Sequence, residues 1–232
     1  MFIKNIFARA WRKLKKILLF LFVLQFVYII ALKWVNPPIT ITQLADWASG
    51  HGLKRDYVDF EDMSPNIRLA VMASEDQLFP DHNGFDIASI KKAIANNKKK
   101  TKRVRGASTI SQQVAKNVFL WQGRSWFRKG MEVYFTFMIE LLWSKQRILE
   151  VYLNVAEMGK GIFGVEAAAK SYFKKSAKKI TRTEAAMIAA CLPNPKLYKV
   201  KPPSRYVNAK FPWILNQMNN LEGDPDVDAL LK

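Results

Sequence analysis

Cysteine and histidine are scarce in this chain. Its 232 residues include one cysteine, Cys191, and two histidines. A single cysteine excludes an internal disulfide framework, and one cysteine with two histidines argues against a structural zinc site. Half of the residues are hydrophobic, so the chain can bury a sizeable core and does not read as disordered. The length fits one domain with an appended segment.

Acidic residues are missing from the segments that carry the excess positive charge. The formal net charge of +18 indicates a polyanionic partner, such as nucleic acid, anionic lipid or a phosphorylated substrate. Residues 1–16 hold six basic residues and no acid, and residues 87–131 hold twelve and no acid. The remaining residues sum to zero. The protein therefore has two basic segments on a neutral body.

An apolar run follows the first basic segment. Residues 17–35 contain two strongly polar side chains, Gln25 and Lys33, and their number approaches the roughly 20 residues that cross a membrane as a helix. The preceding charges predict a single-pass anchor with residues 1–16 in the cytoplasm. A cleaved signal peptide is an alternative, although no small-x-small site directly follows the run, and a buried core helix is another. An uncleaved anchor exports the rest of the chain, which weakens the nucleic-acid interpretation.

The exported part shows helix signals. Residues 36–63 read as a connector with an amphipathic turn at 41–48 and an extended piece near 57–60. Ser64-Pro65 and the capping boxes at Thr109 and Thr181 predict helix starts. We expect helices over residues 65–75, 87–97, 110–120, 125–143, 145–154, 181–192 and 204–221, an Ala-rich helix ending near 172–173, and a mobile loop over 98–105. No stretch alternates with period two for long enough to indicate a sheet, so the predicted fold is all-α, in one domain.

Glu75 is the first residue whose position suggests chemistry. It falls at the last turn of a helix, where the negative end of the helix dipole disfavours the ionised carboxylate and suits it to general acid–base work. Acidic residues at helix ends are also common without a function. His82, in the loop that follows, reads as a residue that fastens the loop or, less simply, as a catalyst or ligand.

A second pattern begins where a glycine-bearing loop enters a capped helix. Gln112, Gln113, Lys116 and Asn117 place amide and ammonium donors behind a helix N-terminus, which itself attracts anions. The alternative is a polar face turned to solvent. Two adjacent glutamines in an otherwise apolar helix favour a buried hydrogen-bonding role.

Glu132 is the first acid after the second basic segment, and two cations precede it on the same helix face. Arg128 stands four residues before it and Lys129 three. As a surface pair this would contribute at most ~1 kcal/mol. The helix continues into an apolar stretch that must be buried, so the carboxylate and its cations fit the departure of a phosphate leaving group, with Glu132 orienting the cations or a metal ion.

Taken together, these segments resemble the peptidoglycan glycosyltransferases, the lysozyme-like domain of bifunctional penicillin-binding proteins and of stand-alone enzymes. Five motifs occur in the family's order: Glu75-Asp76-x-x-Phe79-x-x-His82-x-Gly84, Gly106-x-Ser108-Thr109-Ile110-x-Gln112-Gln113-x-x-Lys116-Asn117, Arg128-Lys129-x-x-Glu132, Lys145-x-x-Ile148-Leu149-Glu150-x-Tyr152-Leu153-Asn154 and Ala185-Ala186 to Leu192-Pro193-x-Pro195. The resemblance covers residues 64–221 and leaves 222–232 as a tail. Because the sequence ends at Lys232, we expect a monofunctional member without a transpeptidase domain.

The resemblance implies lipid II, a disaccharide-pentapeptide on undecaprenyl diphosphate, and the growing glycan chain as substrates. It implies inversion at the donor anomeric carbon, with Glu75 and Glu132 as catalytic carboxylates. The residues that it implies for substrate binding are Phe79, His82, Ser108, Gln112, Gln113, Lys116, Asn117, Arg124, Arg128 and Lys129. No cofactor is required, while Mg²⁺ or Mn²⁺ bridging the diphosphate at Glu132 is an option that the resemblance leaves open.

The expected location is the bacterial inner membrane, with the catalytic domain in the periplasm. Membrane lipid and other cell-wall synthesis or division proteins are expected partners, and nucleic acid is not. Two alternatives compete. A lysozyme-like enzyme that cleaves peptidoglycan would have no need of the cation-rich segment. A membrane-anchored basic protein that binds a polyanion through residues 98–105 would leave Glu75, Glu132 and the glutamine pair unexplained.

Overall fold

The computed structural model describes residues 2–98, 108–123 and 125–231, in two compact units, Met1–Pro37 and Pro38–Lys232. The first unit is the helix α1 (Phe2–Ala31) with a short turn after it. Within α1, Arg9–Ala31 is long and apolar enough to cross a membrane, with a mean hydropathy of 2.1 in its most apolar window. One N-terminal apolar helix is consistent with a single-pass membrane anchor.

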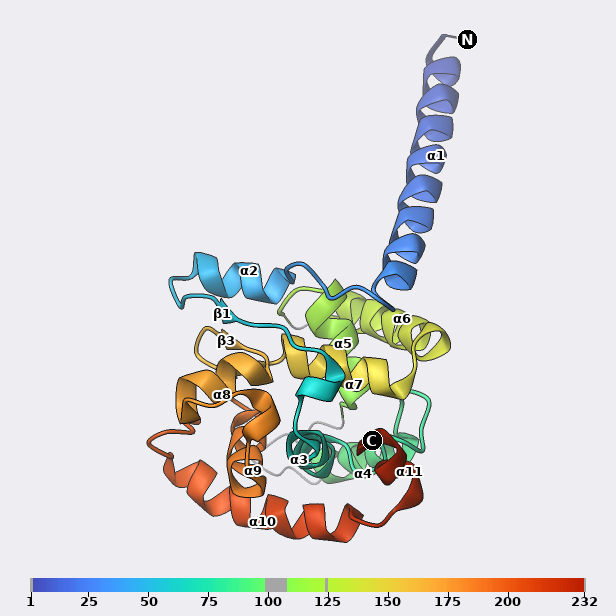
Figure 1. The fold of residues 1–232 in the computed structure, drawn as a ribbon. Helices are drawn as coiled ribbons and strands as arrows, with labels where there is room; N and C mark the ends of the chain where they lie inside the picture. The colour runs from blue at the N-terminus through green and yellow to red at the C-terminus, as the bar shows by residue number, and fades with distance from the viewer. Residues whose placement is uncertain (1, 99–107, 124, 232) are drawn as a thin grey trace. The chain divides into compact units, whose positions relative to one another are not determined.

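The second unit is built mainly from helices, which confirms the all-α prediction (Figure 1). Its helices are α2 (Ile41–Ala48), α3 (Pro65–Glu75), α4 (Ile87–Lys98), α5 (Ile110–Phe119), α6 (Trp126–Leu142), α7 (Lys145–Val155), α8 (Val165–Phe173), α9 (Arg182–Cys191), α10 (Arg205–Leu221) and α11 (Pro225–Leu231), with 3-10 turns η1 (Phe60–Asp62) and η2 (Ala177–Lys179). The predicted tail thus contains a further helix, α11. The predicted mobile loop, apart from its first residue, lies outside the described residues.

The helix starts follow the capping signals of the sequence. Ser64 accepts from the N–H of Asn66 at 3.2 Å, ahead of Pro65 at the first helical position of α3. Thr109 and Thr181 form the capping boxes of α5 and α9. These bonds satisfy helix N–H groups that have no partner within the helix, and they fix where each helix begins.

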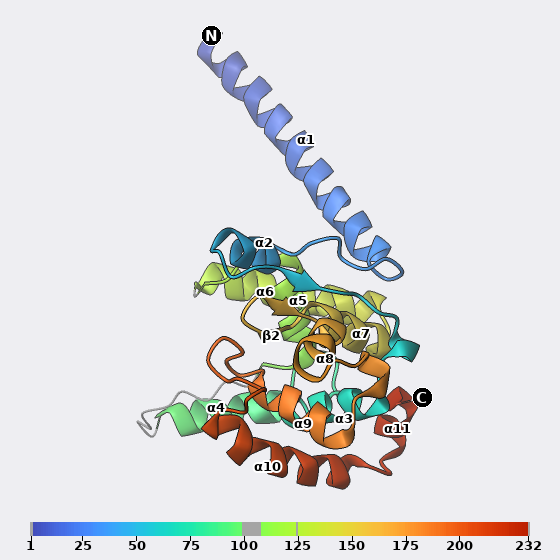
Figure 2. The same ribbon diagram turned by 60° about the vertical axis from the view of Figure 1, so that its left-hand side comes forward.

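Two groups of helices form a large part of this unit. Helix α3 packs against α9 and α10, and α5 packs against α6 and α7. Figures 1 and 2 show the α3–α9–α10 group and the α5–α6–α7 group as separate layers. The middle of α3, from Ile67 to Ala73, is buried throughout. The C-terminal end of α3 lies at the boundary between the two groups, because Glu75 and Asp76 both accept hydrogen bonds from α5.

A small sheet was not predicted. Strand β3 (Ile162–Phe163) pairs parallel with β1 (Lys54–Arg55) and antiparallel with β2 (Glu157–Gly159). Strands of two or three residues cannot show a period-two pattern, so the sequence signal was absent. The sheet ties the connector before α3 to the segment after α7.

Candidate active site

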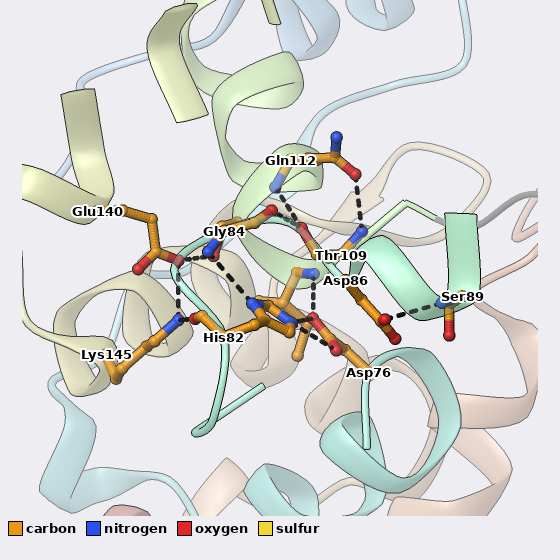
Figure 3. Close-up of polar contacts among 11 residues, drawn as sticks. Asp76, His82, Gly84, Asp86, Ser89, Thr109, Gln112, Glu140 and Lys145 are labelled. Carbon is orange, nitrogen blue, oxygen red and sulfur yellow. Dashed lines mark hydrogen bonds and ion pairs between the residues drawn. The ribbon is translucent and has the colours of Figure 1, made fainter. Parts of the chain in front are cut away.

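A cluster of hydrogen bonds fixes the loop that follows α3. The carboxylate of Asp76 contacts Nε2 of His82 at 2.9 and 3.1 Å and accepts from the backbone N–H of Ile110 at 2.9 Å. Nδ1 of His82 accepts from the N–H of Gly84 at 3.1 Å. With Nδ1 as the acceptor, Nε2 is the ring nitrogen that faces the Asp76 carboxylate. Figure 3 shows the ring between Asp76 and Gly84. The bond from Ile110 to Asp76 ties the end of α3 to the start of α5.

Further bonds hold the same loop to neighbouring helices. The hydroxyl of Thr109 donates to the carbonyl of Gly84 at 2.7 Å, and Lys145 donates to the carbonyl of His82 and to Glu140, the latter at 2.9 Å. Gly84 has a φ of +84°, and a Cβ there would lie 2.8 Å from Cγ2 of Thr136. This position therefore needs glycine, both for its backbone conformation and for space.

Replacing Asp76 by alanine should destabilise the protein. The change leaves two buried donors, on His82 and Ile110, without their acceptor, and we expect the free energy of unfolding to fall by about 3 kcal/mol. Denaturant unfolding followed by circular dichroism measures this. Asp86→Ala is the matched control: Asp86 accepts from the N–H of Ser89 at 2.8 Å at the start of α4, and losing that bond should cost about 1 kcal/mol. Equal losses in the two variants would contradict the buried role of Asp76.

Glu75 ends α3, directly before this cluster, and lies partly buried. Its Oε2 accepts from Nε2 of Gln113 on α5 at 2.8 Å, and its Oε1 accepts from the hydroxyl of Ser74 at 3.4 Å. Burial, with a smaller contribution from the charge of Asp76, raises the pKa of Glu75 above its ordinary value. The carboxylate is therefore a stronger base than an exposed glutamate.

Glu132 is held between two cations on α6. Its Oε2 accepts from Nη1 of Arg128 at 2.7 Å, and its Oε1 accepts from Lys129. Only 4% of its side chain is exposed. Nε of Arg128 is buried and has no acceptor within the described part of the chain. An anion that approached α6 would meet a guanidinium that still has a donor to offer.

Lys116 on α5 links the two carboxylates electrostatically. Burial lowers its pKa, and the negative charges of Glu132 and Glu75 both act in the opposite direction. The site therefore combines a basic carboxylate at the end of α3 with cations on α5 and α6.

A cavity of about 460 Å³ opens beside Lys116 on α5. Gln113, Lys116 and Asn117 line one part of it, together with residues of α2, the end of α7 and the segment after α9. This volume lies within the range of ligand sites, which hold roughly 300–1,000 Å³. A second charged cluster lines the same cavity: Asp46, His51, Glu157 and Lys196.

In this second cluster, the pKa of Glu157 is raised to about 7 by burial and by the charge of Asp46, against the influence of Lys196. Because this value exceeds the ordinary 4.5, Glu157 stabilises the fold below pH 4.5, and this contribution is lost as the pH rises toward 7. Glu157→Gln should therefore leave stability unchanged at pH 4 and raise it by about 1–2 kcal/mol at pH 8. Urea unfolding at both values tests this. Glu61→Gln, at an exposed position, is the control and should leave the free energy of unfolding near that of the wild type.

The comparisons with known proteins identify the family of the chain. The family model described as Transglycosylase matches residues 41–219. The biosynthetic peptidoglycan transglycosylases of Escherichia coli and of Shigella boydii are each 56% identical to the chain over 186 residues, which is 79% of this chain and 77% of theirs. The chain belongs to the transglycosylase family. Its matched region begins with α2, so it includes most of the connector.

The transglycosylase structure brings several predicted site residues together and separates others from the cavity. Glu75 meets Gln113, and Glu132 meets Arg128 and Lys129, as described above. Lys116 and Asn117 line the cavity. Ser108 is exposed at the start of the described segment before α5, and Arg124 lies outside the described residues.

Three predicted substrate-binding residues of the transglycosylase make contacts within the protein. Phe79 is fully buried, with the ring of His82 edge-on to it at 6.3 Å between ring centres. His82 holds the loop, as one sequence interpretation allowed, and Gln112 completes the capping box of α5. Phe79 has no exposed surface in this structure. The role of these three residues in substrate binding stays a prediction.

Three further residues of the transglycosylase were not assigned to the site from sequence. Asp76 and Tyr152 stood within the motifs without a role, and Lys210 on α10 stood outside them. Lys210 is partly buried, and the charge of Glu75 counteracts the lowering of its pKa by that burial. The sequence held no signal for this, because Lys210 comes 135 residues after Glu75 along the chain.

The donor set around Glu132 does not fit a metal ion held by the protein. Both carboxylate oxygens are engaged by cations, and no group of three His, Cys, Asp or Glu side chains suited to a metal occurs within residues 2–98, 108–123 and 125–231.

Proposed function

We propose that this chain polymerises lipid II into the β-1,4-linked glycan strands of peptidoglycan. The family match and the names of the relatives support this activity. The single observation that carries it is the composition of the site: Glu75 has a raised pKa, Glu132 holds two cations, and the charges of both carboxylates act on Lys116. A base and a group of cations that can hold an anion are what this transfer requires.

Glu75 acts as the general base. Its ionised carboxylate takes the proton from the 4-hydroxyl of the acceptor sugar, and that oxygen attacks the anomeric carbon of the donor chain. The bond from that carbon to the diphosphate breaks, and the diphosphate leaves with the bonding electron pair. Attack from the face opposite the leaving group inverts the configuration, which gives a β linkage from an α-linked diphosphate.

The cations receive the leaving group. A diphosphate is already a stable anion, so it needs charge stabilisation rather than a proton. Lys116, Arg128 and Lys129 supply positive charge, and the free Nε–H of Arg128 can donate to a phosphate oxygen. Glu132 keeps the Arg128 and Lys129 side chains in place through its two oxygens. No nucleotide is needed, because the diphosphate carries the activation.

A membrane location suits a substrate with a polyprenyl tail. The helix α1 can anchor the chain, and its basic start favours a cytoplasmic N-terminus with the catalytic unit in the periplasm of the inner membrane. The catalytic unit also exposes apolar side chains on α6, including Trp126 with 93% exposed, Phe127, Phe137 and Leu141. An exposed apolar face of this kind is suited to a lipid surface.

Purified full-length chain tests the proposal directly. Incubation with lipid II should give glycan polymer and undecaprenyl diphosphate, and incubation with purified sacculi should release no soluble fragments. Release of muropeptides without polymer would favour the lysozyme-like alternative. Failure of both reactions, with retained binding of a polyanion, would favour the binding-protein alternative.

A further inference from the structure

The side-chain amide of Gln113 contacts both Glu75 and Tyr152. Its Nε2 donates to Oε2 of Glu75 at 2.8 Å, and its Oε1 accepts from the hydroxyl of Tyr152 at 3.3 Å. Tyr152 lies on α7 with 1% of its surface exposed. Burial raises the pKa of Tyr152 well above its ordinary value, so the hydroxyl keeps its proton and remains able to donate.

The orientation of this amide matters to the base. The two ends of a glutamine amide have nearly the same shape, but one donates hydrogen bonds and the other accepts them. With Nε2 toward Glu75, the amide stabilises the ionised carboxylate. If it turned over, its oxygen would repel the ionised carboxylate and would instead accept a bond from the protonated acid. The orientation of Gln113 and the protonation of Glu75 are therefore linked.

We propose that Tyr152 is a positioning residue that, through Gln113, holds Glu75 in its ionised, proton-accepting state. The proposal rests on the proposed function, because it concerns the base of that reaction. The Tyr152 hydroxyl occupies the amide oxygen of Gln113 and so keeps the donor end on Glu75. This matters most just after proton transfer, when a protonated Glu75 could otherwise draw the amide oxygen toward itself.

Other groups around Glu75 set its charge environment without acting on the amide. Burial and Asp76 favour the protonated form, and Lys210 favours the ionised form. The titratable groups that interact with Glu75 come from its own end of α3 and from α5, α7, α9 and α10: Asp76, Lys116, Tyr152, Cys191 and Lys210. Among these groups, Tyr152 is the one with a hydrogen bond to the oxygen of Gln113.

Tyr152→Phe removes the hydroxyl and keeps the ring. The amide of Gln113 then turns over more freely, the protonated form of Glu75 gains a partner, and the pKa of Glu75 rises. We expect the acid limb of the pH–rate profile for lipid II polymerisation to move upward by about 0.5–1 pH unit, which is a roughly three- to tenfold lower rate below the limb. The rate on the high-pH plateau and the KM for lipid II should stay near those of the wild type.

Tyr172→Phe is the matched control. Tyr172 lies on α8 and is a partly buried tyrosine, but its hydroxyl donates to the carbonyl of Met158 at 2.9 Å rather than to Gln113. Its removal should leave the acid limb in place. An unmoved limb in Tyr152→Phe, or an equal shift in Tyr172→Phe, would overturn the proposal.

A second variant tests the route through the amide. Gln113→Ala should move the acid limb in the same direction and at least as far, and adding Tyr152→Phe to it should cause no further shift. A wild-type limb in Gln113→Ala overturns the proposal even if Tyr152→Phe is too unstable to assay, and so do additive shifts in the double variant. Polymer formation by the wild type is measured in the same assay, so loss of the proposed function itself would be recognised separately.

Discussion

Glu75→Gln should reduce lipid II polymerisation by about 10³-fold or more while the protein stays folded. Glutamine keeps the size of the side chain and can still hydrogen-bond to Gln113 and Ser74, but it cannot accept the proton of the acceptor hydroxyl. General base catalysis contributes typically 10²- to 10⁴-fold. Gel analysis of polymer from purified lipid II gives the rate, and thermal unfolding reports the fold.

The same variant should be slightly more stable than the wild type at neutral pH and above. Burial raises the pKa of Glu75, so the free energy of unfolding falls as the pH rises through that pKa and the buried carboxylate ionises. A neutral amide at this position does not ionise, so the variant avoids this loss of stability. Glu222→Gln is the control. Glu222 is exposed, pairs with Arg182 at 3.0 Å and has no part in the proposed reaction. It should retain full activity. Turnover by Glu75→Gln near the wild-type rate would show that another group is the base.

Glu132→Gln should lower kcat by about 100-fold and also destabilise the protein. The buried carboxylate holds Arg128 and Lys129, and a neutral amide leaves both cations without their counter-charge and free to change rotamer. Misplaced cations stabilise the departing diphosphate poorly, and an interaction of this type is worth roughly 10²- to 10³-fold in rate. Lys129 is 41% exposed, so solvent screens its ion pair with Glu132 and weakens the contribution of that pair to stability. We therefore expect the free energy of unfolding to fall by about 1–3 kcal/mol, less than for a fully buried pair.

Glu150→Gln separates the two effects. Glu150 pairs with Arg147 at 3.0 Å within α7, and both side chains are largely buried, so its loss should also destabilise the protein. It is not part of the proposed anion site, and single-turnover rates with lipid II should stay near those of the wild type. If both variants lost activity in proportion to stability, Glu132 would have no specific part in the transfer.

Local patterns predicted the helices well because their ends are set locally. Thr109 and Thr181 carry their capping partners three residues later, and Pro65 marks the start of α3. The strands β1 and β3 pair residues more than 100 positions apart, and each is two residues long, so neither spacing nor alternation could reveal them. Length and separation therefore explain why the helices were predicted and the sheet was not.

In the candidate site too, features within one helix could be predicted from the sequence, and contacts between distant segments could not. Glu132 with its cations follows from helix spacing, and the position of Glu75 at a helix end was visible in the sequence. What the sequence could not provide was the direction of side chains in a folded loop. His82 and Phe79 share a motif with Glu75, yet the bond from Ile110 to Asp76, across 34 residues, turns that loop inward. Lys210 depends on the packing of α10 against α3, which no local pattern encodes.

Adjacent residues at the end of α3 are both fastened to α5. Glu75 bonds the side chain of Gln113, and Asp76 bonds the backbone of Ile110. The proposed base and its hydrogen-bond donor are thus preorganised before any sugar arrives, and little conformational entropy remains to be lost at this point when the substrate binds. The proposed proton acceptor therefore keeps one position through each successive addition to the glycan.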